Sequence, residues 1–318
     1  VKARLLEEPL AERVIAHSMP VLSDVNDGVS RRVREQYEQS PYPRWVKLAI
    51  PPKVSSVAEV CNALKLQLHS ENIKSVFSPS ILIAGCGTGQ HSIGTASRFA
   101  NCTVKAVDLS LASLAYAQRK TSELGITNIE YLQADILNLG ELRQEFDVIE
   151  SGGVLHHMDD PMAGWRVLVD LLKNDGLMKI GLYSELARRH IVKIRGEIGT
   201  GGTGTSDAEM RQFRQTLTQS HHEHHQKLME SDDFFSLSSL RDLIFHVQEH
   251  RFTLPQIQQC LDELGLQFCG FEDKDLARQF KNSFGKESDA GDLSLWHEFE
   301  TRNPNTFAGM YQFWCQKL

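Results

Sequence analysis

The sequence predicts an α/β fold in which a mostly parallel sheet is covered by helices on both faces. From residue 80 onward, short apolar runs typical of buried strands alternate with segments of helical periodicity. A glycine-rich loop, Gly85–Gly89, follows the first run, and the carboxylate Asp108 ends the second. Such alternation requires crossover connections, which place the carboxyl ends of the parallel strands along one edge of the sheet.

Residues 1–78 are expected to form a helical extension. The stretches LLEEPLAERVIAHS and VSRRVREQYEQS carry apolar residues at three- and four-residue spacing, and Ser56 is placed to cap a further amphipathic helix. Between them, Ser40–Trp45 (SPYPRW) contains two prolines, which exclude a helix. Two interpretations stay open for this segment. It is either a linker whose Tyr42 and Trp45 fill a domain seam, or a gate over a ligand pocket.

Residues 79–184 are expected to form the core of the sheet. Strands are predicted at Ile81–Ala84, Thr103–Val107, Ile129–Gln133, Asp147–Glu150 and Leu177–Tyr183, and helices near 90–99, 110–124 and 161–173.

The remaining chain divides into two parts. Residues 185–250 are polar and helical, contain the glycine-rich Gly199–Thr205 and carry no strand signal, so an inserted helical cap is expected. Residues 251–318 are expected to complete the sheet with a strand pair, Leu266–Phe271 and Phe307–Cys315, at its edge.

Composition limits the classes of partner. The formal net charge is −7, so no global basic field attracts nucleic acid or an anionic membrane. No apolar run approaches the about 20 residues of a transmembrane helix, so no membrane partner is expected. Six cysteines without CxxC spacing favour reduced thiols and a cytoplasmic location. The chain begins at Val1, which suggests a processed product or part of a longer protein.

The glycine-rich loop indicates a nucleotide-type cofactor pocket. Glycines after a strand allow a sharp turn and close approach of a ligand. A dinucleotide fingerprint would place its third glycine at Gln90, so the observed pattern is G-x-G-x-G instead. Asp108 ends the second strand, where a carboxylate can bind ribose hydroxyls. Asp135 follows the third strand, where an adenine amino group would lie.

With these segments in this order, the chain resembles the class I S-adenosylmethionine-dependent methyltransferases over about residues 80–184. The segments VLHH (Val154–His157) and LLKNDGL (Leu171–Leu177) are similar to the quinone-methyltransferase-like branch. The resemblance implies a Rossmann-like seven-stranded sheet and S-adenosyl-L-methionine as cofactor. It also implies that the methionine portion lies against Gly85, Cys86, Gly87, Thr88 and Gly89, the ribose against Asp108 and Leu109, the adenine against Asp135 and Ile136, and the methyl group beside Ser151 and Gly152.

One position departs from the family pattern. Members usually carry an acidic residue two positions before the first glycine, where it helps to hold the ammonium group of the cofactor; here that position is Ile83. The ammonium group is then expected to rely on backbone carbonyls or on another carboxylate.

Candidate catalytic residues follow the fourth and fifth strands. Methyl transfer from a sulfonium depends mainly on alignment and exclusion of water, and a base helps when the acceptor carries a proton. His156 and His157 are the first candidates for acceptor contact or base, with capping or loop histidines as the alternative. Glu150, Tyr183 and Glu185 are second candidates. Closure from the N-terminal side is expected from Tyr37, Tyr42, Arg44 and Trp45.

A histidine cluster, His221–His225 (HHEHH), invites a metal interpretation. A helix would place His221 beside His224 and His225, but no HExxH pattern is formed, so no metal site is expected. A solvated helix or an acceptor-recognition surface is favoured. Arg188 and Arg189 are expected on a solvated helix face, where an anionic acceptor group could use them.

The leading hypothesis is a methyltransferase that acts on a small molecule or a peptide side chain by in-line transfer. A non-catalytic S-adenosylmethionine-binding module for regulation or assembly is one alternative, with Ile83 as its sequence hint. An RNA methyltransferase is another, and it is disfavoured because ESGG, Glu150–Gly153, stands where an Asp/Asn-Pro-Pro-Tyr segment is associated with base amines. Helical additions of this kind often meet across a homodimer.

Overall fold

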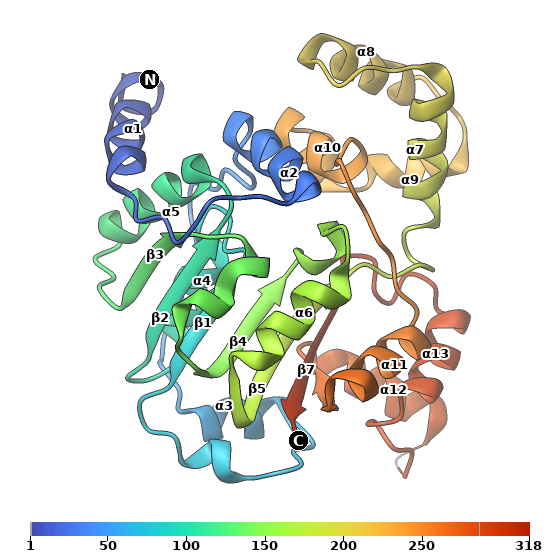
Figure 1. Ribbon diagram of the computed structural model, residues 1–318. Helices are drawn as coiled ribbons and strands as arrows, with labels where there is room; N and C mark the ends of the chain where they lie inside the picture. Colours follow the sequence, from blue (N-terminus) through green and yellow to red (C-terminus); the bar gives the residue numbers. More distant parts are fainter. Residues whose placement is uncertain (1, 286) are drawn as a thin grey trace.

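The computed structural model describes residues 2–285 and 287–318, and it contains a seven-stranded sheet with the order β3-β2-β1-β4-β5-β7-β6 (Figure 1). The first five strands run parallel, and β7 lies antiparallel between β5 and β6. The predicted Rossmann-like α/β fold class is confirmed. The strands are β1 (Ser80–Ala84), β2 (Thr103–Asp108), β3 (Ile129–Gln133), β4 (Phe146–Gly152), β5 (Leu172–Leu182), β6 (Leu266–Phe271) and β7 (Tyr311–Lys317).

Helices occupy the connections and the N-terminal part. They are α1 (Glu8–Ser18), α2 (Gly28–Gln39), α3 (Val57–Leu64), α4 (Gln90–Arg98), α5 (Leu111–Glu123), α6 (Pro161–Asp170), α7 (Arg189–Gly201), α8 (Asp207–Thr218), α9 (Glu223–Met229), α10 (Leu237–Ile244), α11 (Leu254–Leu264), α12 (Lys274–Phe284) and α13 (Leu293–Arg302). Short helical turns are η1 (Ala3–Glu7), η2 (Asn72–Ser75), η3 (Ile136–Leu142), η4 (Leu155–His157) and η5 (Asp232–Phe234).

Each face of the sheet has its own hydrophobic core because side chains alternate along a strand. In β1, Leu82 and Ala84 face a core that includes Trp165 of α6 and Trp296 of α13. Ile81 and Ile83 face the opposite core, which α3, α4 and α5 cover. Parallel strands buried on both sides explain why the apolar runs in the sequence are nearly continuous.

The edge pair differs from its predicted limits at one end. The last strand begins at Tyr311, and Phe307 lies outside it, packed into the core with 3% of its surface exposed. Phe307 contacts Phe271 at 4.9 Å between ring centroids and Tyr311 at 4.6 Å. An aromatic residue that fills a core from a loop is not distinguishable by hydrophobicity from one in a strand.

The segment between β5 and α11 forms helices α7 to α10 with a small core of their own. Ile194 of α7, Met210 of α8, Leu228 of α9 and Leu240 of α10 are fully buried together. Figure 1 shows these helices beyond the carboxyl end of the sheet, with α10 beside α2. These five helices, α2 and α7 to α10, are called the cover below.

Among the described residues, no helix combines the length and the apolar character needed to cross a membrane.

Candidate active site

A cavity of about 580 Å³ lies where the carboxyl ends of the parallel strands meet the cover. Its floor comes from the residues that follow β1 to β5. Its roof comes from α2, from Tyr42 and Pro43, and from Asp233 and Asp242 of the segment around α10. Ligands of open parallel sheets bind at this edge because all strand ends converge there.

The loop after β1 is shaped by its glycines. Gly85 has φ +77°, and a Cβ at this position would lie 2.2 Å from Val154 Cγ2, so no side chain fits. The backbone N–H groups of Gly85 and Cys86 both donate to the Val107 carbonyl at 2.9 Å, which fixes the turn against β2. Cys86 is buried, and burial raises the pKa of its thiol well above the usual range.

Asp108 is held in place by the backbone on both sides. Its Oδ2 accepts from the Gly87 N–H at 2.8 Å and its Oδ1 from the Ser110 N–H at 2.9 Å. Burial raises its pKa to about 6, and the two backbone donors act in the opposite direction. Each oxygen keeps a lone pair, so the carboxylate can still accept from hydroxyl groups of a ligand in the cavity.

Asp135 is a second carboxylate at the cavity wall. It is 3% exposed, and its Oδ1 accepts from the Leu137 N–H at 3.1 Å, as an N-cap of η3. Ile136 and Leu109 line the cavity next to the two carboxylates. An apolar wall with a carboxylate acceptor beside it suits a heteroaromatic base that carries an amino group.

Nine of the eleven predicted cofactor contacts line this cavity. They are Gly85, Cys86, Gly87, Thr88, Asp108, Leu109, Asp135, Ile136 and Gly152. Gly89 and Ser151 lie behind the wall: a Cβ on Gly89 would lie 2.6 Å from Ala117 Cβ, and Ser151 donates to the Ala84 carbonyl at 3.1 Å. Both residues shape the loop and the strand ends rather than the cavity surface.

The segment that contains the two prolines contacts the glycine loop. Trp45 Nε1 donates to the Thr88 carbonyl at 3.0 Å, and Thr88 Oγ1 donates to the Pro43 carbonyl at 2.5 Å. Tyr42 lines the cavity and donates to Asp233 Oδ1 at 2.9 Å. Trp45 is 8% exposed and packs on Tyr116. The segment therefore contains both a seam filler and a wall of the cavity, whereas Arg44 pairs with Glu12 away from it.

Ile83 and Glu150 are neighbours on adjacent strands. They are partners in the β1–β4 register, and both are fully buried. Glu150 Oε2 accepts from His91 Nε2 and Thr95 Oγ1 at 2.5 and 3.0 Å and lies 3.5 Å from Lys179 Nζ. Burial alone would raise the pKa of Glu150, but Lys179 and His91 hold it well below the usual range. Glu150 is therefore a buried anion outside the cavity lining.

His91 is a cavity residue that the sequence reasoning missed. It is the second residue of α4, and its ring lies 3.7 Å from the position of a Cβ on Gly152. Nε2 bonds to Glu150, so Nδ1 is the ring nitrogen that has no hydrogen-bond partner among the described residues, and it lies on the side of Gly152. Because His91 follows the glycine loop by two residues, its position in the sequence could have indicated that it lies at the cavity.

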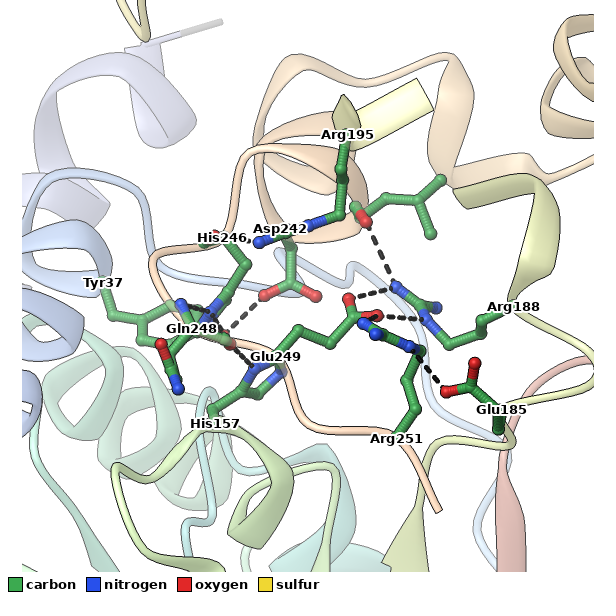
Figure 2. Close-up of polar contacts among 11 residues, drawn as sticks. Tyr37, His157, Glu185, Arg188, Arg195, Asp242, His246, Gln248, Glu249 and Arg251 are labelled. Carbon is green, nitrogen blue, oxygen red and sulfur yellow. Dashed lines mark hydrogen bonds and ion pairs between the residues drawn. The ribbon is translucent and has the colours of Figure 1, made fainter. Parts of the chain in front are cut away.

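The two candidate histidines have different environments. His156 is fully buried and stacks on Tyr183 at 3.8 Å between ring centroids, and neither of its ring nitrogens has a partner among the described residues. His157 lines the cavity, and its Nδ1 donates to the Gln248 carbonyl at 2.6 Å (Figure 2). Burial, followed by the neighbouring His156 and His246, lowers the pKa of His157 well below the usual range. His157 is therefore a neutral imidazole with its proton on Nδ1.

Tyr37, Asp242 and His246 form a polar cluster in the roof. The Tyr37 hydroxyl donates to Asp242 Oδ1 at 2.5 Å and lies 3.2 Å from His246 Nε2. The His246 ring stacks on His157 at 3.5 Å, and its Nδ1 donates to the same Gln248 carbonyl at 2.8 Å. Burial raises the pKa of Asp242 to about 6. Asp242 and His246 carried no motif in the sequence.

A buried ion pair supports the far wall of the cavity. Arg188 Nη2 lies 2.7 Å from Glu249 Oε2 (Figure 2). The guanidinium of Arg188 also lies over the Tyr183 ring, 3.6 Å from its centroid. The expectation of a solvated face for Arg188 is wrong, because its side chain is only 5% exposed. Glu185 pairs with Arg251 at 3.0 Å and does not line the cavity. Tyr183 does line it, and burial raises the pKa of its hydroxyl above the usual range.

Comparison with known proteins finds one matching domain family and relatives that are less than 30% identical. Residues 81–176 match the sequence model of the family described as "Methyltransferase domain". An uncharacterized protein of Synechococcus sp. is 27% identical over 297 residues, covering 86% of this chain and 68% of that protein. A ubiquinone biosynthesis O-methyltransferase of Actinobacillus pleuropneumoniae is 28% identical over 140 residues, covering 42% and 58%.

A solved structure shares the fold. PKMT2 from Rickettsia typhi in complex with AdoHcy superimposes with a TM-score of 0.58 at 17% identity, covering 84% of this chain and 54% of that protein. The chain therefore spans little more than half the length of the ubiquinone-pathway relative and of PKMT2.

Proposed function

We infer that this chain, which carries a class I S-adenosylmethionine-dependent methyltransferase domain, methylates a small molecule or a peptide side chain held in the cavity between the strand ends and the cover. The observation that carries this proposal is the convergence in one cavity of the glycine loop, two ribose- and adenine-type carboxylates and a neutral histidine with a free nitrogen. Bound S-adenosylmethionine would supply an electrophilic methyl group on its sulfonium.

The residues of the cavity fit this cofactor. A Cβ on Gly87 would lie 3.3 Å from the Tyr42 carbonyl, so the absence of a side chain leaves space between the loop and the roof. Asp108 would hold the ribose and Asp135 the adenine amino group. Ile83 cannot bind an ammonium group, because its aliphatic side chain has no acceptor atom and lies fully buried in the core. We therefore assign the methionine end to the backbone of the loop and to His91, whose Nδ1 faces Gly152.

His157 is the proposed proton acceptor. The Gln248 carbonyl holds the proton on Nδ1, so Nε2 carries the lone pair and has no partner among the described residues. A proton from a hydroxyl or amine acceptor would move to Nε2. The imidazolium formed would be stabilised by the Gln248 carbonyl, which accepts from Nδ1 in both states. His156 would act through packing on Tyr183 and not by proton transfer.

The roof determines which acceptors fit. Asp233 and Asp242 present carboxylates to the cavity, and the charge of Arg188 is neutralised by Glu249. An acceptor with hydroxyl or amine donors would therefore be favoured over one with a carboxylate or phosphate. The proposed reaction is in-line transfer to such an oxygen or nitrogen, with water excluded by Tyr37 and Tyr42.

The test compares two adjacent histidines. Turnover is measured as release of S-adenosylhomocysteine over a panel of hydroxyl and amine acceptors, and cofactor binding is measured by calorimetry. His157→Asn should retain cofactor affinity and lose about 10²- to 10⁴-fold in kcat. The matched variant, His156→Phe, keeps a ring on Tyr183 and should retain most of kcat. Equal losses of kcat in both variants would refute the proposed role of His157. Absence of cofactor binding by the wild type would refute the proposal that the chain is a methyltransferase.

A further inference from the structure

The histidine-rich stretch of the cover forms a side-chain cluster apart from the cavity. Glu197 lies on α7, and His224 and His225 lie on α9. His224 Nε2 is 2.6 Å from Glu197 Oε1, and His225 Nε2 is 2.6 Å from Glu197 Oε2. These ligand atoms all lie within 4.8 Å of one another. One carboxylate and two imidazole nitrogens thus converge from two helices.

We propose that Glu197, His224 and His225 form a binding site for a divalent transition metal ion, with zinc as the preferred ion, that ties α9 to α7. Two imidazoles and one carboxylate form a ligand set typical of zinc, which takes nitrogen ligands at about 2.0–2.1 Å and completes a tetrahedron with water. The ion would take the place of the two protons that now join Glu197 to the histidines. The side chains of Glu197, His224 and His225 are 41%, 19% and 9% exposed, so small movements of these side chains can make room for the ion.

A supporting hydrogen bond orients one ligand. His225 Nδ1 lies 2.7 Å from Ser220 Oγ. A serine hydroxyl can donate to Nδ1 when Nε2 carries a proton, and it can accept from Nδ1 when Nε2 binds a metal. Histidines that bind metals use their second nitrogen in this way, so the ring is already fixed in a coordinating orientation. The ring of His225 is largely buried, which limits its rotation.

The sequence alone favoured no metal because the third ligand is remote. The sequence pattern suggested that His221 shares a helix face with His224 and His225. Helix α9 begins only at Glu223, so His221 lies before the helix and does not share that face. Glu197 contributes from 27 and 28 residues away. No spacing within HHEHH indicates that carboxylate.

The position of the site gives it a structural role. Arg188 precedes α7 and Asp233 follows α9, and both residues line the cavity. A metal ion between α7 and α9 would fix the two segments that deliver these side chains. The three ligands lie outside the cavity lining, so the metal site would form whether or not the chain transfers methyl groups.

The first test is a zinc titration of the chelator-stripped full chain, with a chromophoric chelator as competitor. We expect one equivalent per chain. Glu197→Ala and His225→Ala should each weaken binding at least about tenfold. The control His221→Ala removes an exposed histidine of the same stretch and should not change the affinity. Zinc should raise the melting temperature of wild type and His221→Ala, and not that of Glu197→Ala.

The second test uses the unmodified protein, so it does not depend on the folding of variants. X-ray absorption of the zinc-loaded wild type should show two imidazoles among light-atom ligands. Three or four imidazoles would place the ion on the exposed histidines and overturn the proposal. Absence of binding at micromolar zinc, or unchanged affinity in folded Glu197→Ala, would do the same.

Discussion

Acidification should weaken cofactor binding through Asp108, because the carboxylate must be ionised to accept two ribose hydroxyls. Burial raises its pKa to about 6, although Ser110 and Gly87 donate to it. About nine-tenths of the carboxylate is then ionised at pH 7 and about one-tenth at pH 5. If only the ionised form binds, affinity falls about tenfold over this range, or about 1.4 kcal/mol.

The stability of the free protein has the opposite dependence on this group. With a folded pKa above the unfolded value of 3.8, the native state binds the proton more readily between about pH 4 and 6. The cost of Asp108 to folding is therefore largest above pH 6 and falls as the pH drops through this window. Protonation of Asp108 does not unfold the chain, so the loss of affinity can be measured on folded protein.

The assay is calorimetric titration with S-adenosylhomocysteine, which lacks the methyl group and does not react, at pH 5, 6, 7 and 8 with circular dichroism as a folding control. Asp108→Asn should bind weakly at every pH, with a flat profile. Asp242 also has a pKa raised to about 6 by burial, so Asp242→Asn is the matched control, and it should keep the wild-type slope. A flat wild-type profile, or a slope that survives in Asp108→Asn, would refute the ribose assignment.

Two further predictions concern the support of the site. Gly85→Ala should abolish cofactor binding and lower the melting temperature, since its Cβ would lie 2.2 Å from Val154 Cγ2 at φ +77°; calorimetric affinity within twofold of wild type would contradict this. Lys179→Met leaves the fully buried Glu150 without its cation and should cost about 3–5 kcal/mol in denaturant unfolding. The exposed control Lys53→Met should cost less than about 1 kcal/mol, and equal costs for the two variants would show that Glu150 does not depend on its charge partner.

The strands that position the glycine-loop end of the cavity could be predicted because their signals are local. The apolar run before Gly85 and the carboxylate after the second run lie within 29 consecutive residues, 80–108, and β1 and β2 have nearly the predicted bounds. A buried parallel strand needs apolar side chains on both faces, and a close turn needs glycine. Both requirements are met by neighbours in the chain, so they are visible in the sequence.

The roof of the cavity and the surroundings of His157 could not be predicted in this way. Tyr37 and Asp242 are 205 residues apart, and His157 meets the Gln248 carbonyl across 91 residues. No periodicity or spacing encodes these pairs. They form because α10 packs beside α2 and the chain after α10 returns to the segments that follow β4 and β5, where the His250 N–H donates to the His156 carbonyl. The same reason separates His156 from His157: adjacent in sequence, one ring points into the core and the other into the cavity.

The sequence by itself determined the fold class and most of the predicted residues that line the cavity, because strand burial and the glycine turn depend on nearby residues. The tertiary structure decided which titratable groups face the ligand and in which protonation state. Burial and hydrogen-bond partners set the pKa of Asp108 and the tautomer of His157, and both depend on segments far apart in the chain. The convergence of Glu197 with His224 and His225 arises from the packing of α7 against α9 for the same reason.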